Sequence, residues 1–141
     1  MDPRARRLPL MPPIPASIMA LQSYQELRVW QRGMDLVVEC YAIAEQLPAT
    51  ETYELARQIR RSAVSVPSNI AEGYGRGHVG EYVQFLSIAN GSLKELETQI
   101  LIASRLAFIA TADCEQILRQ TAVVGRMLTV LRRKMHQLRS R

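Results

Sequence analysis

The sequence predicts an all-α protein, an antiparallel up-down-up-down four-helix bundle whose second helix has a proline kink. The composition favours helix, because alanine, leucine, glutamine, glutamate and arginine are abundant and aromatic residues make up only 6%. Apolar residues recur every three or four positions along four long stretches, which is the period of one buried helix face. Short connections separate these stretches, and helices joined in this way pack beside one another.

The first expected helix runs from about Tyr24 to Leu47 and stops at Pro48. Its expected buried face alternates steps of three and four, as in a heptad seam, and comprises Leu27, Trp30, Met34, Val37, Tyr41 and Ala44. Other apolar residues lie off the expected seams and indicate a second apolar surface, hence self-association; examples are Leu36, Val38, Ile43, Leu101, Ile102 and Val130.

The second expected helix runs from about Thr50 to Glu72, with Glu51 near its positive end. Its apolar residues are Leu55, Ile59, Ala63, Val66 and Ile70. Pro67 interrupts this pattern at a cost of about 3 kcal/mol, because it lacks an amide donor and crowds the carbonyl four residues back. A break into two short helices at Val66 is the alternative, but valine is a poor N-cap. The freed carbonyls have short polar side chains nearby, on Ser62, Ser65, Ser68 and Asn69.

A glycine-rich exit follows the second helix. Gly73 is expected to take a left-handed capping conformation, and Gly75 and Gly77 continue the turn. These glycines leave a helix rather than a strand and lack the Lys-Ser/Thr of a phosphate loop, so they predict a helix corner.

The third expected helix runs from about Val79 to Ile109. Its seam keeps phase through Tyr82, Leu86, Ala89, Leu93, Leu96, Ile100, Ala103 and Ala107. Ser92 and Glu95 match a capping box, which would start a fresh helix at Ser92. The unbroken phase across Gly91 favours one helix, in which this glycine would let a neighbouring helix approach closely.

The fourth expected helix is capped by Asp113. Its seam comprises Ile117, Thr121, Val124, Leu128, Leu131, Met135 and Leu138. The cations of this helix are expected on its outer face. Residues 111–141 hold seven basic and two acidic residues, so the net charge of this segment is +5. This equals the net charge of the whole chain.

The domain prediction is a Pro-rich, basic, disordered arm over residues 1–23 and the bundle over 24–141. Five of the seven prolines lie in the arm, at positions 3, 9, 12, 13 and 15. A start of translation at Met19 is the alternative. No apolar run reaches the length of about 18 residues that would span a membrane. The two cysteines, Cys40 and Cys114, are expected to be reduced, as in a cytoplasmic protein.

Catalytic and metal-binding patterns were not found in the sequence. Cys40 and Cys114 are far apart and are expected to be reduced, and His78 and His136 have no metal-ligand spacing. The sequence has no recognisable Ser/His/Asp or Cys/His arrangement of catalytic residues. The expectation is therefore a protein that is not an enzyme and has no cofactor or metal.

Basic residues are the one functional pattern. A polyanionic partner, RNA or DNA, is the first hypothesis, with salt-sensitive phosphate contacts and weak sequence preference. Pairing with Glu54 and Glu72 is the competing interpretation on the second helix, and a solvated face on the fourth. A protein-protein interaction module is the alternative function. The candidate nucleic-acid-binding residues are Arg57, Arg60, Arg61, Arg76, Arg119, Arg126, Arg132, Arg133 and Lys134.

Several motifs stand in an order that resembles a known family. They are Leu27-Arg-Val-Trp30, Pro48-x-x-Glu51-x-Tyr53, Gln58-Ile-Arg-Arg61, Ser65-x-Pro67-x-Asn69-Ile-Ala-Glu-Gly73 and Ala89-x-Gly91-Ser92-x-x-Glu95. The chain resembles the four-helix-bundle proteins encoded in intervening sequences of bacterial 23S rRNA genes. Accessory variability determinants of diversity-generating retroelements belong to the same family. Glu54 and Gly77-His-Val-Gly80 depart from the usual pattern.

The resemblance implies a homopentamer with a positively charged surface that binds nucleic acid and, in the retroelement branch, a reverse transcriptase. It assigns Arg60, Arg61 and Arg76 to that surface. The motif residues expected to shape the architecture are Ser65, Pro67, Asn69, Glu72, Gly73 and Gly91.

Overall fold

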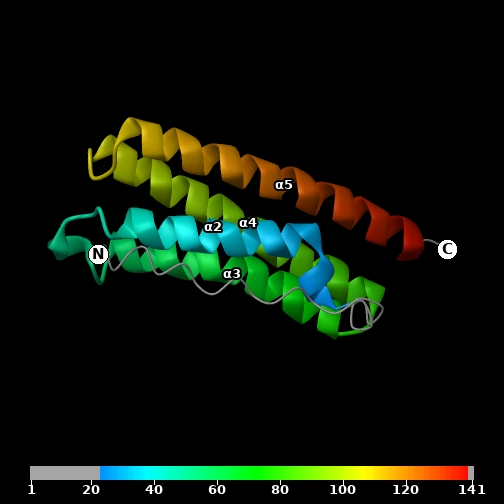
Figure 1. The fold of residues 1–141 in the computed structure, drawn as a ribbon. Helices are drawn as coiled ribbons and strands as arrows, with labels where there is room; N and C mark the ends of the chain where they lie inside the picture. Colours follow the sequence, from blue (N-terminus) through cyan, green and yellow to red (C-terminus); the bar gives the residue numbers. More distant parts are fainter. Residues whose placement is uncertain (1–22, 140–141) are drawn as a thin grey trace, which may run out of the picture.

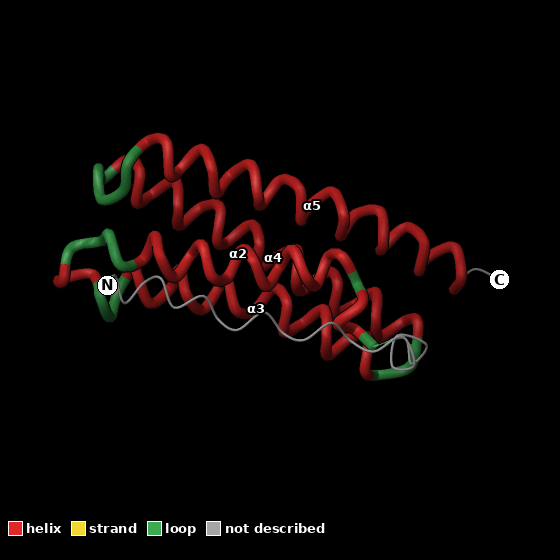
Figure 2. The backbone as a smooth tube through the Cα atoms, in the orientation of Figure 1, coloured by secondary structure: helices red, strands yellow, loops and turns green. Residues whose placement is uncertain are grey.

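A computed structural model describes residues 23–139, which form four α-helices and two short 3-10 helices. In chain order they are η2 (Tyr24–Glu26), α2 (Arg28–Ala44), η3 (Ala49–Glu51), α3 (Leu55–Gly75), α4 (Val79–Arg105) and α5 (Thr111–Arg139). Figure 2 shows only helices and connecting loops over this part of the chain. The expected all-α four-helix bundle is confirmed. The expected N-terminal arm, apart from Ser23, lies outside the described residues.

The four long helices enclose one core. Helix α3 packs against α2 and α4, and α5 packs against the same two helices from the other side. Figure 1 shows the chain reversing direction along the bundle at each of the three connections. The largest fully buried side chains come from all four helices and include Leu36, Ile59, Ile70, Leu86, Leu93, Leu96, Ile100, Ile117 and Leu128.

Helix α3 runs unbroken through Pro67, so a break at Val66 is wrong. The bend at Pro67 stays a prediction. The Asn69 amide donates to the carbonyl of Ser65 at 2.7 Å and to its hydroxyl at 2.9 Å. That hydroxyl also lies 2.7 Å from the hydroxyl of Ser92 on α4. The polar residues of the motif therefore join α3 to α4 beside the proline.

Gly73 does not cap α3, because it lies within the helix and is buried. The left-handed conformation belongs instead to Gly77, with φ of 74°. A Cβ on Gly73 would lie 2.6 Å from the Cβ of Phe85 on α4, so this glycine allows the two helices to approach closely. The close approach expected at Gly91 is wrong, because a Cβ there would meet nothing within 4 Å.

Helix α4 is continuous through Ser92, and its seam is buried from Tyr82 to Ala103. The last expected seam residue, Ala107, is exposed instead, because the helix has already ended. Ala107 has a φ of 58°, and the amide of Phe108 donates to the carbonyl of Ala103 at 2.9 Å. This is the hydrogen-bond pattern of a left-handed helix end, formed here on an alanine.

The buried face of α2 is rotated relative to the expected seam, of which Ala44 is buried and Leu27, Trp30 and Val37 are partly buried. The buried residues of this helix are Val29, Gly33, Leu36, Cys40, Ile43 and Ala44. Met34 and Tyr41, which were expected in the core, are 41% and 45% exposed. A Cβ on Gly33 would lie 3.4 Å from the Cβ of Pro67, so the small residue marks the face that packs on α3. Leu36 and Ile43 consequently belong to the core and not to the second apolar surface.

Helix α5 is covered along only part of its length. Its seam is buried at Ile117, Thr121, Val124 and Leu128. Leu131 and Met135 are half-buried, and Leu138 is 53% exposed. The last turns of α5 extend past the start of α2 (Figure 1). Asp113 lies in the first turn of the helix and not before it.

Candidate nucleic-acid interface

Three of the predicted basic residues lie together on the first half of α3. Arg57, Arg60 and Arg61 line a shallow groove of about 460 Å³ with Tyr41 of α2 and with Val64 and Ser65; we call it the α3 groove. Arg57 and Arg61 are four residues apart and both are exposed. The spacing of one helical turn places these two guanidinium groups on the same side of α3.

The cations of this groove lack carboxylate partners. Within residues 23–139, no Asp or Glu lies at ion-pair distance from Arg57, Arg60 or Arg61, so the predicted pairing with Glu54 is wrong. Arg60 donates to the backbone carbonyl of Thr52 at 3.0 Å, which holds its side chain across the start of α3. The groove therefore presents positive charge that the described residues leave uncompensated.

Arg76 has a different environment. Its guanidinium forms an ion pair with Glu72 at 2.9 Å, one helical turn away, and lies 5.1 Å from the centre of the Phe85 ring. The predicted pairing with Glu72 is thus confirmed. Both contacts are intramolecular, so Arg76 is less available to an anionic ligand than the three arginines of the groove.

The predicted cations of α5 have different environments. Arg119 donates to the side chain of Gln116 at 2.7 Å, whereas Arg133 is exposed. Arg132 is half-buried, and its Nε is buried without a hydrogen-bond partner. Arg126 and Lys134 border a separate pocket, described next.

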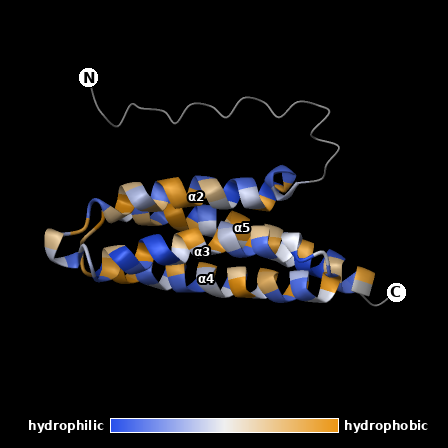
Figure 3. Cartoon of the chain, turned by 90° about the horizontal axis from the view of Figure 1, so that it is seen from below, coloured by the Kyte–Doolittle hydropathy of each residue, from blue (hydrophilic) through white to orange (hydrophobic). Residues whose placement is uncertain are grey.

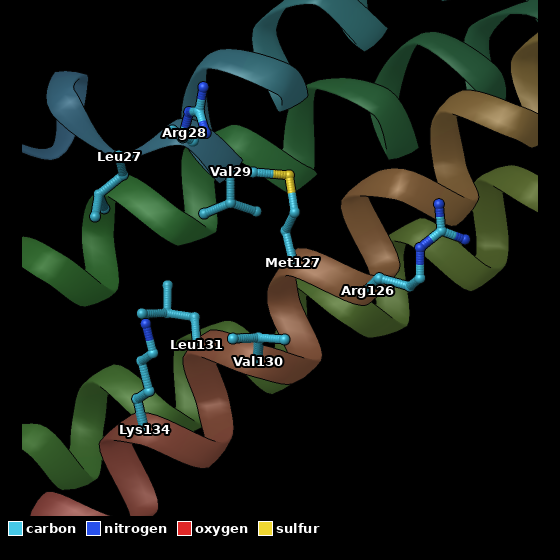
Figure 4. A pocket seen from close by; sticks show the side chains of 8 residues that line it. All are labelled: Leu27, Arg28, Val29, Arg126, Met127, Val130, Leu131 and Lys134. Carbon is cyan, nitrogen blue, oxygen red and sulfur yellow. The ribbon is translucent and has the colours of Figure 1, made fainter.

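This pocket, of about 380 Å³, lies between the start of α2 and the second half of α5. Its apolar residues come from both helices and face one another (Figure 4): Leu27, Val29, Met127, Val130 and Leu131. Three cations lie at its edge: Lys134 extends toward the apolar side chains, whereas Arg28 and Arg126 extend away from them (Figure 4). We call these eight residues the α2–α5 pocket.

A third concave surface is mainly apolar and lies between α2 and α3. Its volume is about 370 Å³, and it is lined by Tyr24, Trp30, Met34, Val37, Val64, Pro67, Ser68 and Ala71. Its apolar character comes largely from Trp30, Met34 and Val37, which the sequence had placed in the core. Figure 3 shows hydrophobic residues on several turns along α2.

Two buried groups have strongly shifted pKa values. Burial and, second, the nearby Glu39 carboxylate raise the pKa of the Cys40 thiol to about 12. Burial and then Tyr74 raise the pKa of Tyr82 to about 12. Neither group lines one of the grooves. The part of the chain that the structure describes holds no cluster of His, Cys, Asp and Glu suited to a metal, and none of its helices could cross a membrane.

A family model described as 23S rRNA-intervening sequence protein matches residues 25–130. This match covers three quarters of the chain. The chain belongs to this family. A comparison with curated proteins found no match.

The fold agrees with that of a solved structure. It is the crystal structure of a protein with unknown function from the S23 ribosomal protein family of Bacteroides thetaiotaomicron. The two structures superpose with a TM-score of 0.70 at 20% sequence identity, over 74% of this chain and 95% of that chain. At this identity the likeness concerns the fold alone.

The family match includes the whole α3 groove but ends at Val130, within the α2–α5 pocket. Sequence reasoning had missed two residues of these sites, Tyr41 and Arg28. Tyr41 was assigned to the core, although it supplies an aromatic side chain beside three arginines. Arg28 lies in the first turn of α2, which has no acidic residue, but the expected start at Tyr24 placed it beyond the first turn.

Proposed function

We propose that this intervening-sequence protein is a non-catalytic nucleic-acid-binding bundle that binds single strands of RNA or DNA in the α3 groove. The observation that supports this most is the joint presence of Arg57, Arg60, Arg61 and the 45%-exposed Tyr41 in one groove. Arginine side chains neutralise phosphates, and an aromatic ring stacks on an unpaired base of any identity.

The test is a fluorescence-anisotropy titration with a labelled RNA strand of about 12 nucleotides, its DNA equivalent and an RNA hairpin. Affinity for the strands should fall steeply between about 50 and 200 mM salt. The double variant Arg57→Gln/Arg61→Gln should reduce the slope of log K against log salt by about 1.4, because two phosphate contacts are lost. Binding that ignores salt, or no binding at low salt, would refute the proposal.

A matched control removes two charges elsewhere. Arg126→Gln/Lys134→Gln lowers the net charge equally but leaves the α3 groove intact, so it should change the salt slope much less. Tyr41→Ala should weaken strand binding by about 1–3 kcal/mol, whereas Tyr41→Phe should retain it, because the ring supplies the stacking. Equal effects of the two charge variants would indicate non-specific attraction by net charge.

Assembly is the second part of the proposal. The apolar surface between α2 and α3 suits self-association, and the resemblance implies a homopentamer; native mass spectrometry measures the subunit number directly. A cytoplasmic accessory role, beside a reverse transcriptase or in an rRNA intervening sequence, agrees with family membership. The alternative of a protein-protein interaction module without nucleic-acid binding is favoured if the α3 groove binds neither RNA nor DNA.

A further inference from the structure

The α2–α5 pocket combines an apolar interior with a positive edge. Val29 is almost fully buried, Leu27, Met127 and Leu131 are half-buried, and Val130 is 50% exposed. None of the described residues that line the pocket is acidic. Over residues 23–139, no carboxylate lies at ion-pair distance from Arg28, Arg126 or Lys134. The pocket thus lacks internal charge compensation.

The start of α2 adds to this positive charge. Leu27 occupies the N-cap position, and its apolar side chain cannot accept hydrogen bonds from the first backbone amides of the helix. The first turn of α2 contains no acidic residue. The first residue is Arg28, although the positive end of a helix dipole favours a carboxylate. A negatively charged group supplied from outside would therefore be stabilised here by the helix end and by the three cations together.

The apolar surface continues beyond the pocket along α5. Leu131 and Met135, which are both half-buried, and Leu138, which is 53% exposed, follow at helical spacing. From Met127 to Leu138 the strip extends about 16 Å at 1.5 Å per residue, or about three helical turns. An elongated strip of this length suits a helix better than a small molecule, and the methionines let such a surface adapt to its partner.

We propose that the α2–α5 pocket binds an acidic amphipathic helix of another protein. The apolar stripe of that helix packs between α2 and the uncovered part of α5, and its carboxylates face Arg28, Arg126 and Lys134. Charge complementarity selects an acidic partner over a basic one. The pocket lining contains no aromatic ring on which a base could stack, so a protein suits this site better than a nucleic acid. This inference is independent of nucleic-acid binding in the α3 groove.

The test uses a fluorescein-labelled peptide of about 18 residues, with leucines at positions i, i+3, i+4 and i+7 of each repeat and glutamates beside them. Two control peptides have lysine in place of glutamate, or the same composition in scrambled order. The acidic peptide should bind the full-length protein, and both controls should bind at least about tenfold more weakly. Equal binding of the scrambled peptide overturns the proposal.

Charge reversal locates the site. Arg126→Glu/Lys134→Glu should weaken the acidic peptide by about tenfold or more and strengthen the lysine peptide. Arg57→Glu/Arg61→Glu makes the same charge change on α3, away from the pocket, and should leave the preference for the acidic peptide in place. Both pairs include exposed cations, and thermal unfolding checks that each variant folds.

The remaining outcomes also decide the matter. Val130→Glu places a negative charge on an exposed pocket position and should abolish binding of the acidic peptide. If this variant instead splits an oligomer of the protein, the pocket holds a second copy of the chain. If Arg126→Glu/Lys134→Glu abolishes RNA binding and leaves peptide binding unchanged, the occupant is a nucleic acid. Either of these results overturns the proposal.

Discussion

The parts of α5 before and after residue 128 have the same apolar spacing but different surroundings. The seam residues from Ile117 to Leu128 are buried against α2 and α4. Beyond Leu128 the same spacing continues through Leu131 and Met135 to Leu138, which is 53% exposed. The comparison shows that periodicity identifies an apolar face but does not show what covers it.

Truncation of a buried leucine of α5 should have the largest effect on stability, and truncation of a half-buried leucine a smaller one. Leu128→Ala leaves a cavity in the core and should lower the free energy of unfolding by about 2–5 kcal/mol. Leu131→Ala removes the same atoms from a half-buried position, so its cost should be about 1 kcal/mol. Urea denaturation measures both. Similar losses for the two variants would contradict the difference in coverage.

Alanine substitution of two glycines should change stability in opposite directions, depending on whether another helix covers the glycine. Gly73→Ala forces apart α3 and α4 at Phe85 and should cost about 1–3 kcal/mol. Gly91→Ala meets no neighbour and should gain about 1 kcal/mol from helix propensity. The difference in melting temperature between each variant and the parent gives the sign. A loss of stability at both positions would show that α4 is covered at Gly91.

A smaller change in stability is expected with pH, because the Cys40 thiol is buried on the covered face of α2. Because burial raises the pKa of Cys40 to about 12, the unfolded chain loses the thiol proton from about pH 9 upward while the folded chain keeps it. Stability is therefore full below pH 9 and should fall by about 1 kcal/mol between pH 9 and 10. Tyr82 adds to the loss above pH 10. Cys40→Ala should flatten the profile between pH 9 and 10; an unchanged profile would show that Cys40 is not its source.

The helices themselves could be predicted from the sequence because their apolar spacing is long and regular. The seam of α4 was identified correctly from Tyr82 to Ala103, where large aliphatic residues recur on one face. The buried face of α2 was not identified correctly. Helix α2 contacts α3 through the small residue Gly33, whereas the larger Trp30 and Met34 lie beside this contact. Hydrophobicity favours the larger side chains, whereas close helix packing selects the smaller ones.

The candidate site was predicted in part. The cluster of Arg57, Arg60 and Arg61 follows from positions on one helix and could be seen in the sequence. Its aromatic member, Tyr41, comes from a neighbouring helix, and the error in the face of α2 hid it. The division of the α5 cations between separate surfaces depends on how α2 begins beside α5, which no local pattern encodes.

The central claim is that the cations of this protein belong to two surfaces with different ligands. One measurement tests it most directly: parallel titration of the single-stranded RNA and the acidic peptide against two variants that each remove two positive charges. We predict that Arg57→Gln/Arg61→Gln weakens RNA binding and leaves peptide binding unchanged, and that Arg126→Gln/Lys134→Gln does the reverse. Equal loss of both ligands in both variants would contradict the claim.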